Sequence, residues 1–77
     1  MEPYQERVVK EREELNIKIG KLSDFIADPQ FSTLVDVDEQ ERLKWQFICM
    51  SLYSTILHER IAAFAKGRDL TMWGHGH

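Results

Sequence analysis

The sequence predicts an all-α protein: an antiparallel two-helix hairpin with an irregular connector that associates into a homo-oligomeric helical bundle. Two long segments repeat apolar residues with the helical period of about 3.6, and a stretch containing a proline separates them. The second segment is also apolar on two opposite sides, of which a hairpin partner covers only one. We therefore expect one hairpin domain at residues 1–67, followed by a C-terminal tail at residues 68–77.

The first helix is expected at about residues 3–27. Pro3 suits the first turn of a helix, because the N–H that proline lacks would have no partner there. The apolar positions that follow form a single stripe, which contains Tyr4, Val8, Leu15, Ile19, Leu22 and Ile26. Asp28 and Pro29 should end the helix, since a proline disfavours helical geometry in the residue before it.

The connector is expected at residues 28–37. Its pattern predicts no regular structure, and its apolar residues should cover one end of the core: Phe31, Leu34 and Val35. The second helix is then expected at about residues 38–66. Its start offers two capping boxes, Asp36 with Glu39 and Asp38 with Glu41. Gly67 can take the left-handed conformation that commonly ends a helix.

Two apolar faces run along the second helix. The face expected against the first helix alternates spacings of four and three, and it contains Leu43, Phe47, Met50, Ser54, Leu57, Ile61 and Phe64. The residues that we call the outer stripe fall on nearly the opposite side: Trp45, Ile48, Leu52 and Ile56. A soluble monomer rarely exposes such a stripe. We therefore expect another copy of the chain, or a partner protein, to cover it, most simply in a four-helix bundle.

Composition excludes several classes of protein. A net charge of −3 with 43% hydrophobic residues argues against disorder and against generic DNA binding. A single cysteine excludes an internal disulfide, and no motif for a metal, a cofactor or catalysis is found. The charged N-terminus and the short uncharged run from Trp45 to Leu57 predict neither a signal peptide nor a membrane span. We expect a cytoplasmic protein that is not an enzyme.

Aromatic and basic residues gather where the start of the first helix and the end of the second helix should meet. This open end of the hairpin, opposite the connector, provides a candidate ligand site made of Tyr4, Arg7, Lys10, Arg60 and Phe64. Aromatic faces stack on bases, and arginines hold phosphates. The alternative is structural, because basic residues near a helix C-terminus also interact favourably with its dipole.

A second candidate pocket is centred on Arg12, which interrupts the apolar stripe of the first helix. An antiparallel pairing with Ile26 near Leu43 places Arg12 close to Ser54 and His58. A guanidinium group there could hold a phosphate or a carboxylate. The alternative is that Arg12 pairs with Glu59 or another carboxylate, or extends its charged end into water.

With the opening Tyr-Gln-x-Arg-Val from Tyr4 and the ending Leu-x-x-Arg-Ile from Leu57, the sequence resembles a family of small helical proteins of tailed phages and prophages that are related to a product of a crAss-like phage. The resemblance covers about residues 4–64, and its distinctive parts are the opening Tyr-Gln-x-Arg-Val and the ending Leu-x-x-Arg-Ile. The residues that carry it are Tyr4, Gln5, Arg7, Val8, Glu11, Glu14, Leu15, Leu22 and Phe25, then Gln46, Met50, Tyr53, Leu57, Arg60, Ile61 and Phe64.

The resemblance implies a non-enzymatic phage protein acting in the bacterial host cell. Small phage proteins of this kind often counter bacterial immunity, and some sequester nucleotide signals. No binding residue is carried over from the family. Two main hypotheses follow: an anti-defence protein that sequesters a cyclic dinucleotide or a signal of cyclic ADP-ribose type, or a protein-interaction module that binds a host or phage protein through the outer stripe. A purely structural or regulatory phage component is the third alternative.

Overall fold

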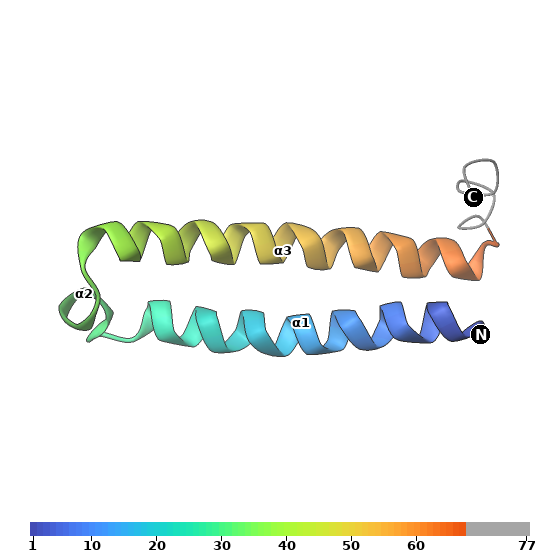
Figure 1. Ribbon diagram of the computed structural model, residues 1–77, viewed down its shortest axis with the longest axis horizontal. Helices are drawn as coiled ribbons and strands as arrows, with labels where there is room; N and C mark the ends of the chain where they lie inside the picture. The colour runs from blue at the N-terminus through green and yellow to red at the C-terminus, as the bar shows by residue number, and fades with distance from the viewer. Residues whose placement is uncertain (68–77) are drawn as a thin grey trace.

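The computed structural model describes residues 1–67 and contains three helices, α1 (Pro3–Ala27), α2 (Phe31–Leu34) and α3 (Val37–Ala65). Figure 1 shows α1 and α3 side by side and antiparallel, with α2 at the end where the chain turns. The prediction of an all-α hairpin is confirmed for the part of the chain that is described. The expected tail at residues 68–77 lies outside the described residues.

The ends of α1 follow from its sequence. The backbone N–H of Glu2 donates to Gln5 Oε1 at 2.9 Å, which satisfies a donor that the helix itself leaves unpaired. At the other end Asp28 has an extended backbone with ψ of 132°. This is the geometry that Pro29 imposes on the residue before it.

The sequence predicted an irregular connector, and this prediction is wrong at its centre, which forms the single-turn helix α2. The Asp28 carboxylate accepts a hydrogen bond from the backbone N–H of Gln30 at 2.7 Å and starts the turn. Phe31 is buried and makes an edge contact with Phe25, with ring centroids 5.3 Å apart. Leu34 is 67% exposed and does not cover the core, which corrects another expectation. The helical turn puts Phe31 and Val35 on one face and Leu34 beside it.

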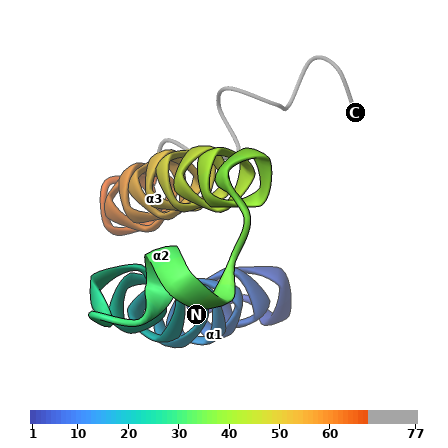
Figure 2. The ribbon, with the colours of Figure 1, turned by 90° about the vertical axis from the view of Figure 1, so that its left-hand side faces the viewer.

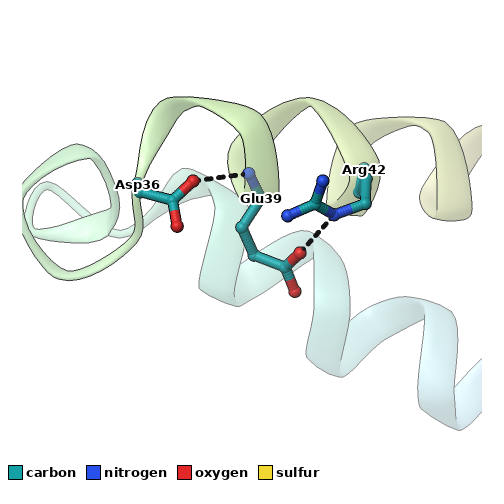
Figure 3. Close-up of polar contacts among 3 residues, drawn as sticks. All are labelled: Asp36, Glu39 and Arg42. Carbon is teal, nitrogen blue, oxygen red and sulfur yellow. Dashed lines mark hydrogen bonds and ion pairs between the residues drawn. The ribbon is translucent and has the colours of Figure 1, made fainter.

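The cap of α3 is Asp36, as one of the two predicted boxes requires. Its carboxylate accepts from the backbone N–H of Glu39 at 2.9 Å (Figure 3). The Glu39 carboxylate forms an ion pair with Arg42 Nε at 2.7 Å, one turn later in the same helix. After α3, Gly67 has φ of 66°, the left-handed conformation expected at the helix stop.

The core is a narrow seam between α1 and α3, which Figure 2 shows end-on as two stacked helices. Within residues 1–67 the buried apolar side chains are Val8, Phe31 and Leu57, and Leu57 is fully buried. The other predicted seam residues of α3, apart from the buried Ser54, are half-buried. A hairpin with so few buried side chains has little hydrophobic stabilisation of its own.

Candidate functional site

The open end of the hairpin brings the first turn of α1 beside the last turn of α3 (Figure 1). Tyr4 and Phe64 meet there, with ring centroids 5.9 Å apart and ring planes at 77°. Both side chains are half-buried. The start of α1 and the end of α3 therefore form one aromatic pair, which closes the seam at this end.

Arg7 and Arg60 lie at the same level of the hairpin. Tyr4 is beside Phe64 and Arg12 is beside Ser54, so the antiparallel register sets Arg7 level with Arg60. Both arginine side chains are exposed, and within residues 1–67 the structure assigns neither of them an ion pair.

The two arginines also share one edge of the hairpin. Leu57 marks the line of α3 that faces α1, and Ser54 and Arg60 each lie about 60° from it, on opposite sides. In α1, Arg12 lies about 40° from the line of the buried Val8, and Arg7 lies about 100° from it on the opposite side. Because Ser54 contacts Arg12 on one edge, Arg60 and Arg7 occupy the other.

Lys10 is not brought to this cluster. It stands two residues from the buried Val8 and two from Arg12, which contacts α3, so the helical period puts it on the outer side of α1. Its side chain is exposed. Of the five predicted residues, the geometry assembles four around the open end: Tyr4, Arg7, Arg60 and Phe64.

A polar network occupies the second predicted pocket. Arg12 Nε donates to the carbonyl oxygen of Ser54 at 3.2 Å, and the Ser54 hydroxyl donates to Asn16 Oδ1 at 2.5 Å. Ser54 is only 6% exposed, whereas Arg12 is half-buried. No buried side-chain nitrogen or oxygen in the described part of the chain lacks a partner, so the terminal nitrogens of Arg12 reach the surface.

The network differs from the sequence prediction in two ways. Asn16 belongs to it and was missed, although it lies one turn after Arg12 on the same edge of α1, which is the signal that could have found it. His58 is exposed and makes no hydrogen bond to Arg12 or Ser54 among the described contacts. Arg12 bonds to a backbone carbonyl and not to Glu59, the carboxylate considered as an alternative.

The outer stripe lies on the side of α3 away from α1. Trp45 and Leu52 are each 63% exposed, and Ile48 and Ile56 are also exposed. Tyr53 and Cys49 extend the exposed surface along one border. Cys49 is exposed because it lies on the border of the stripe, outside the seam.

Residues 1–67 hold no group of three or more His, Cys, Asp or Glu side chains that could bind a metal ion. Among the described helices, none is both long and apolar enough to cross a membrane.

A shallow apolar hollow of about 180 Å³ lies near the connector, far from the aromatic pair, and is lined by Ser23, Ile26, Ala27 and Phe47.

The model of the Sequestin family matches residues 2–63. The chain belongs to the Sequestin family. The matched Sequestin region includes Arg7 and Arg60, the network of Arg12 and Ser54, and the whole outer stripe. Phe64 lies one residue beyond it.

A curated relative supports the link to phages. The chain is 46% identical over 61 residues to an uncharacterized 7.5 kDa protein in the denB-rIIB intergenic region of Enterobacteria phage T4, covering 79% of this chain and 94% of the relative. No solved structure matches. Membership of a small phage protein family is thus established. The Sequestin match and the T4 relative do not support the link to a crAss-like phage product that the resemblance suggested.

Proposed function

We propose that this Sequestin-family protein binds and sequesters a nucleotide-derived immune signal of the bacterial host, of cyclic dinucleotide or cyclic ADP-ribose type. It acts as an anti-defence protein in the cytoplasm of the infected cell, by binding and not by catalysis. The family name and the phage relative support a sequestering phage protein. The ligand class rests on the residues of the open end.

The observation that carries the proposal is the pair Arg7 and Arg60. Two exposed guanidinium groups at one level and on one edge provide two positive charges for one anionic ligand. Guanidinium groups bind phosphate through two parallel hydrogen bonds. A ligand with two phosphates, or with a pyrophosphate, matches such a pair.

The aromatic pair supplies a surface for the base. In the T-shaped contact of Tyr4 and Phe64, the ring that presents its edge keeps its faces clear of the other ring. Stacking of a base on an aromatic side chain contributes about 1–3 kcal/mol, whatever the base. Phosphate-binding and base-binding groups therefore lie together at the open end.

The network of Arg12, Ser54 and Asn16 is a second candidate pocket within the same proposal. Arg12 donates through Nε to Ser54, on the edge opposite Arg7, and its terminal nitrogens are left for an anion. Such a group offers a fixed anion-binding fork. His58, exposed one turn after Ser54, is a further candidate on α3.

Thermal unfolding with a panel of cyclic dinucleotides, cyclic trinucleotides and ADP-ribose isomers tests the proposal. A ligand at 100 times its dissociation constant stabilises the folded state by about 2.7 kcal/mol. For a domain of this size that raises the Tm by several degrees. A folded protein whose Tm is unchanged by every compound contradicts the proposal.

The second candidate function is a protein-interaction module. The observation that favours it is the outer stripe, because an exposed apolar helix face of this kind is what helix-in-groove partners bind. Capture of one specific host or phage protein by the native chain, lost in Leu52→Lys and retained in Ile17→Lys, supports it. Equal capture by both variants rules out the stripe as the docking site.

We also propose that the chain associates with itself. The support is energetic: residues 1–67 bury three apolar side chains within one hairpin, while the outer stripe is left in water. Burial of apolar surface contributes about 25 cal/mol per Å² before the cost of association. The oligomeric mass, measured on the sample used for thermal unfolding, tests this.

A further inference from the structure

We infer that the shallow hollow near the connector and the Arg12 network form one nucleotide site, in which the network holds a phosphate and the hollow takes a base. The inference rests on the proposed function, because it concerns a ligand of the same chemical class. It adds a place for a base, which the Arg12 pocket lacks. The site lies on the edge of the hairpin opposite Arg7 and Arg60.

The hollow and the network lie on the same edge of the hairpin. In α1, Ser23 follows Asn16 by seven residues, which is nearly two full turns, and in α3 Phe47 precedes Ser54 by the same interval. Asn16 and Ser54 are joined by a hydrogen bond, and Ser23 and Phe47 line the hollow together. The same pairing of positions therefore recurs along one edge, about 10 Å nearer the connector.

The network supplies donors for the phosphate. Arg12 uses Nε for the Ser54 carbonyl oxygen, and its two terminal nitrogens can form the parallel hydrogen bonds that guanidinium groups make to phosphate. The Asn16 side chain accepts from Ser54 through Oδ1, so its amide nitrogen provides a further donor one turn away. Among the contacts of residues 1–67, neither Arg12 nor Asn16 has a carboxylate partner.

The hollow has the size and the lining for a single base. Its volume of about 180 Å³ is below the roughly 300–1,000 Å³ of pockets that enclose a whole drug-sized ligand. It therefore holds one ring system and leaves the rest of the ligand outside. Phe47 provides an aromatic ring, Ile26 and Ala27 provide apolar contacts, and the Ser23 hydroxyl can bond to the edge of a base.

The surface between the two ends of the site is open at Gly20. This residue lies within α1, between Asn16 and Ser23, at a position where glycine stabilises a helix less than alanine does. A Cβ atom built there meets nothing within 4 Å, so packing inside the hairpin does not require the glycine. A ligand that crosses this turn meets no side chain from it. The carboxylates that border this edge of α1, Glu13 and Asp24, are turned farther from α3 than Asn16 and Ser23 are.

The spacing of the two ends suits one nucleotide. A phosphate bound to the guanidinium group of Arg12 lies partway along the 10 Å between the level of Ser54 and the level of Phe47. The sugar then crosses the turn of Gly20, and the base enters the hollow.

Titration with adenosine monophosphate (AMP) tests the site, with adenosine and inorganic phosphate as partial probes. Backbone amide resonances of the isotope-labelled native protein are followed by NMR. AMP should shift the amides of Asn16, Gly20 and Ala27 together. Inorganic phosphate should shift only those near Arg12, and adenosine only those near the hollow.

The variant Ala27→Leu fills the hollow and keeps the Arg12 network. Ala27 is the last residue of α1 and is exposed, so the larger side chain should leave the fold intact. The dissociation constant of AMP should rise about fivefold or more, as expected for the loss of one stacked base, and that of inorganic phosphate should stay unchanged. Gln46→Leu adds the same side chain beside Phe47 on the opposite edge of α3, and it is the matched control.

Equal affinity of the native protein and Ala27→Leu for AMP, or AMP shifts confined to the open end, would overturn the inference and leave the proposed function in place. AMP binding at the hollow, with a Tm that no cyclic nucleotide or ADP-ribose isomer changes, would support the site and contradict the proposed class of signal. A folded native protein that responds to none of the three probes overturns the inference, whatever the other compounds do.

Discussion

Arg12 of α1 and Ser54 of α3 lie across from each other in the hairpin, and Arg12 Nε donates to the Ser54 carbonyl oxygen at 3.2 Å. Ser54 is also bonded through its hydroxyl to Asn16, so one residue of α3 is held by two residues of the same edge of α1. Apolar side chains alone allow two helices to slide by a turn. This polar contact favours a single register, as buried polar residues do in coiled coils.

The first prediction concerns that network. Asn16→Ala leaves the buried Ser54 hydroxyl without its acceptor and should lower the free energy of unfolding by about 1–3 kcal/mol. Ser54→Ala removes the hydroxyl itself, so no buried donor is left without an acceptor. This variant should lower the free energy of unfolding by less than Asn16→Ala does. Urea unfolding of both single variants and the double variant measures the coupling. Thr55→Ala, which removes an exposed hydroxyl bonded within α3, is the matched control, and strictly additive effects would contradict the prediction.

The second prediction concerns the start of α3. Asp36→Ala removes the carboxylate that accepts from the N–H of Glu39 and should destabilise the fold by about 0.5–2 kcal/mol. Asp38→Ala removes an equal charge from the first turn without removing the cap, and should cost about 0.3–1 kcal/mol. Thermal unfolding compares the two. Equal losses would show that charge, and not capping, stabilises this helix end.

The third prediction concerns the open end. With a compound that raises the Tm of the native protein, Arg7→Ala and Arg60→Ala should each weaken binding by about tenfold or more, since a hydrogen bond to a charged group contributes about 1.5–3 kcal/mol. Lys10→Ala should have a smaller effect because Lys10 lies on the outer side of α1. Lys21→Ala removes the same charge far from the site and serves as the control. Calorimetric titration measures the dissociation constants.

If both arginine variants keep their fold and their affinity for the ligand, the ligand does not bind at the open end. Arg12→Met would then be the informative variant, because it keeps the packing of the side-chain stem and removes the guanidinium group. Loss of binding in that variant alone would assign the ligand to the second pocket.

The fourth prediction concerns the outer stripe. Leu52→Lys should lower the oligomeric mass in sedimentation, because it puts a charge at the centre of the inferred interface. Ile17→Lys is the matched control, since Ile17 is 59% exposed on α1, away from the stripe, against 63% for Leu52. Both variants should remain helical. Equal effects of the two substitutions on association would contradict the role of the stripe.

Much of the fold follows from local rules of sequence. The period of the apolar residues predicts two long helices, the proline at position 29 predicts where α1 ends, and Gly67 predicts where α3 ends. The stagger inferred from one assumed pairing, Ile26 near Leu43, correctly brought Arg12 to Ser54. The helices and their ends depend on backbone preferences and helical spacing, which neighbouring residues determine, whereas the stagger depends on a pairing between residues far apart in the chain.

The connector and the polar contacts were harder to predict. The helical turn of α2 forms where Phe31 packs on Phe25, a contact that no local preference encodes. Asn16 joined the network and His58 did not, although both are polar residues one turn from a predicted member. Helical spacing does not distinguish the two positions, because each residue lies one turn after a predicted member on its own helix.

The sequence by itself therefore determined the two long helices, their ends and the two apolar faces of the second one, because periodicity and capping act within a few residues. The tertiary structure decided which polar groups meet across the seam: Arg12 with Ser54 rather than with Glu59, and Arg7 level with Arg60 while Lys10 faces outward. Such pairings depend on the register and the relative rotation of two helices that are joined only at one end. Contacts between residues far apart in the chain determine both.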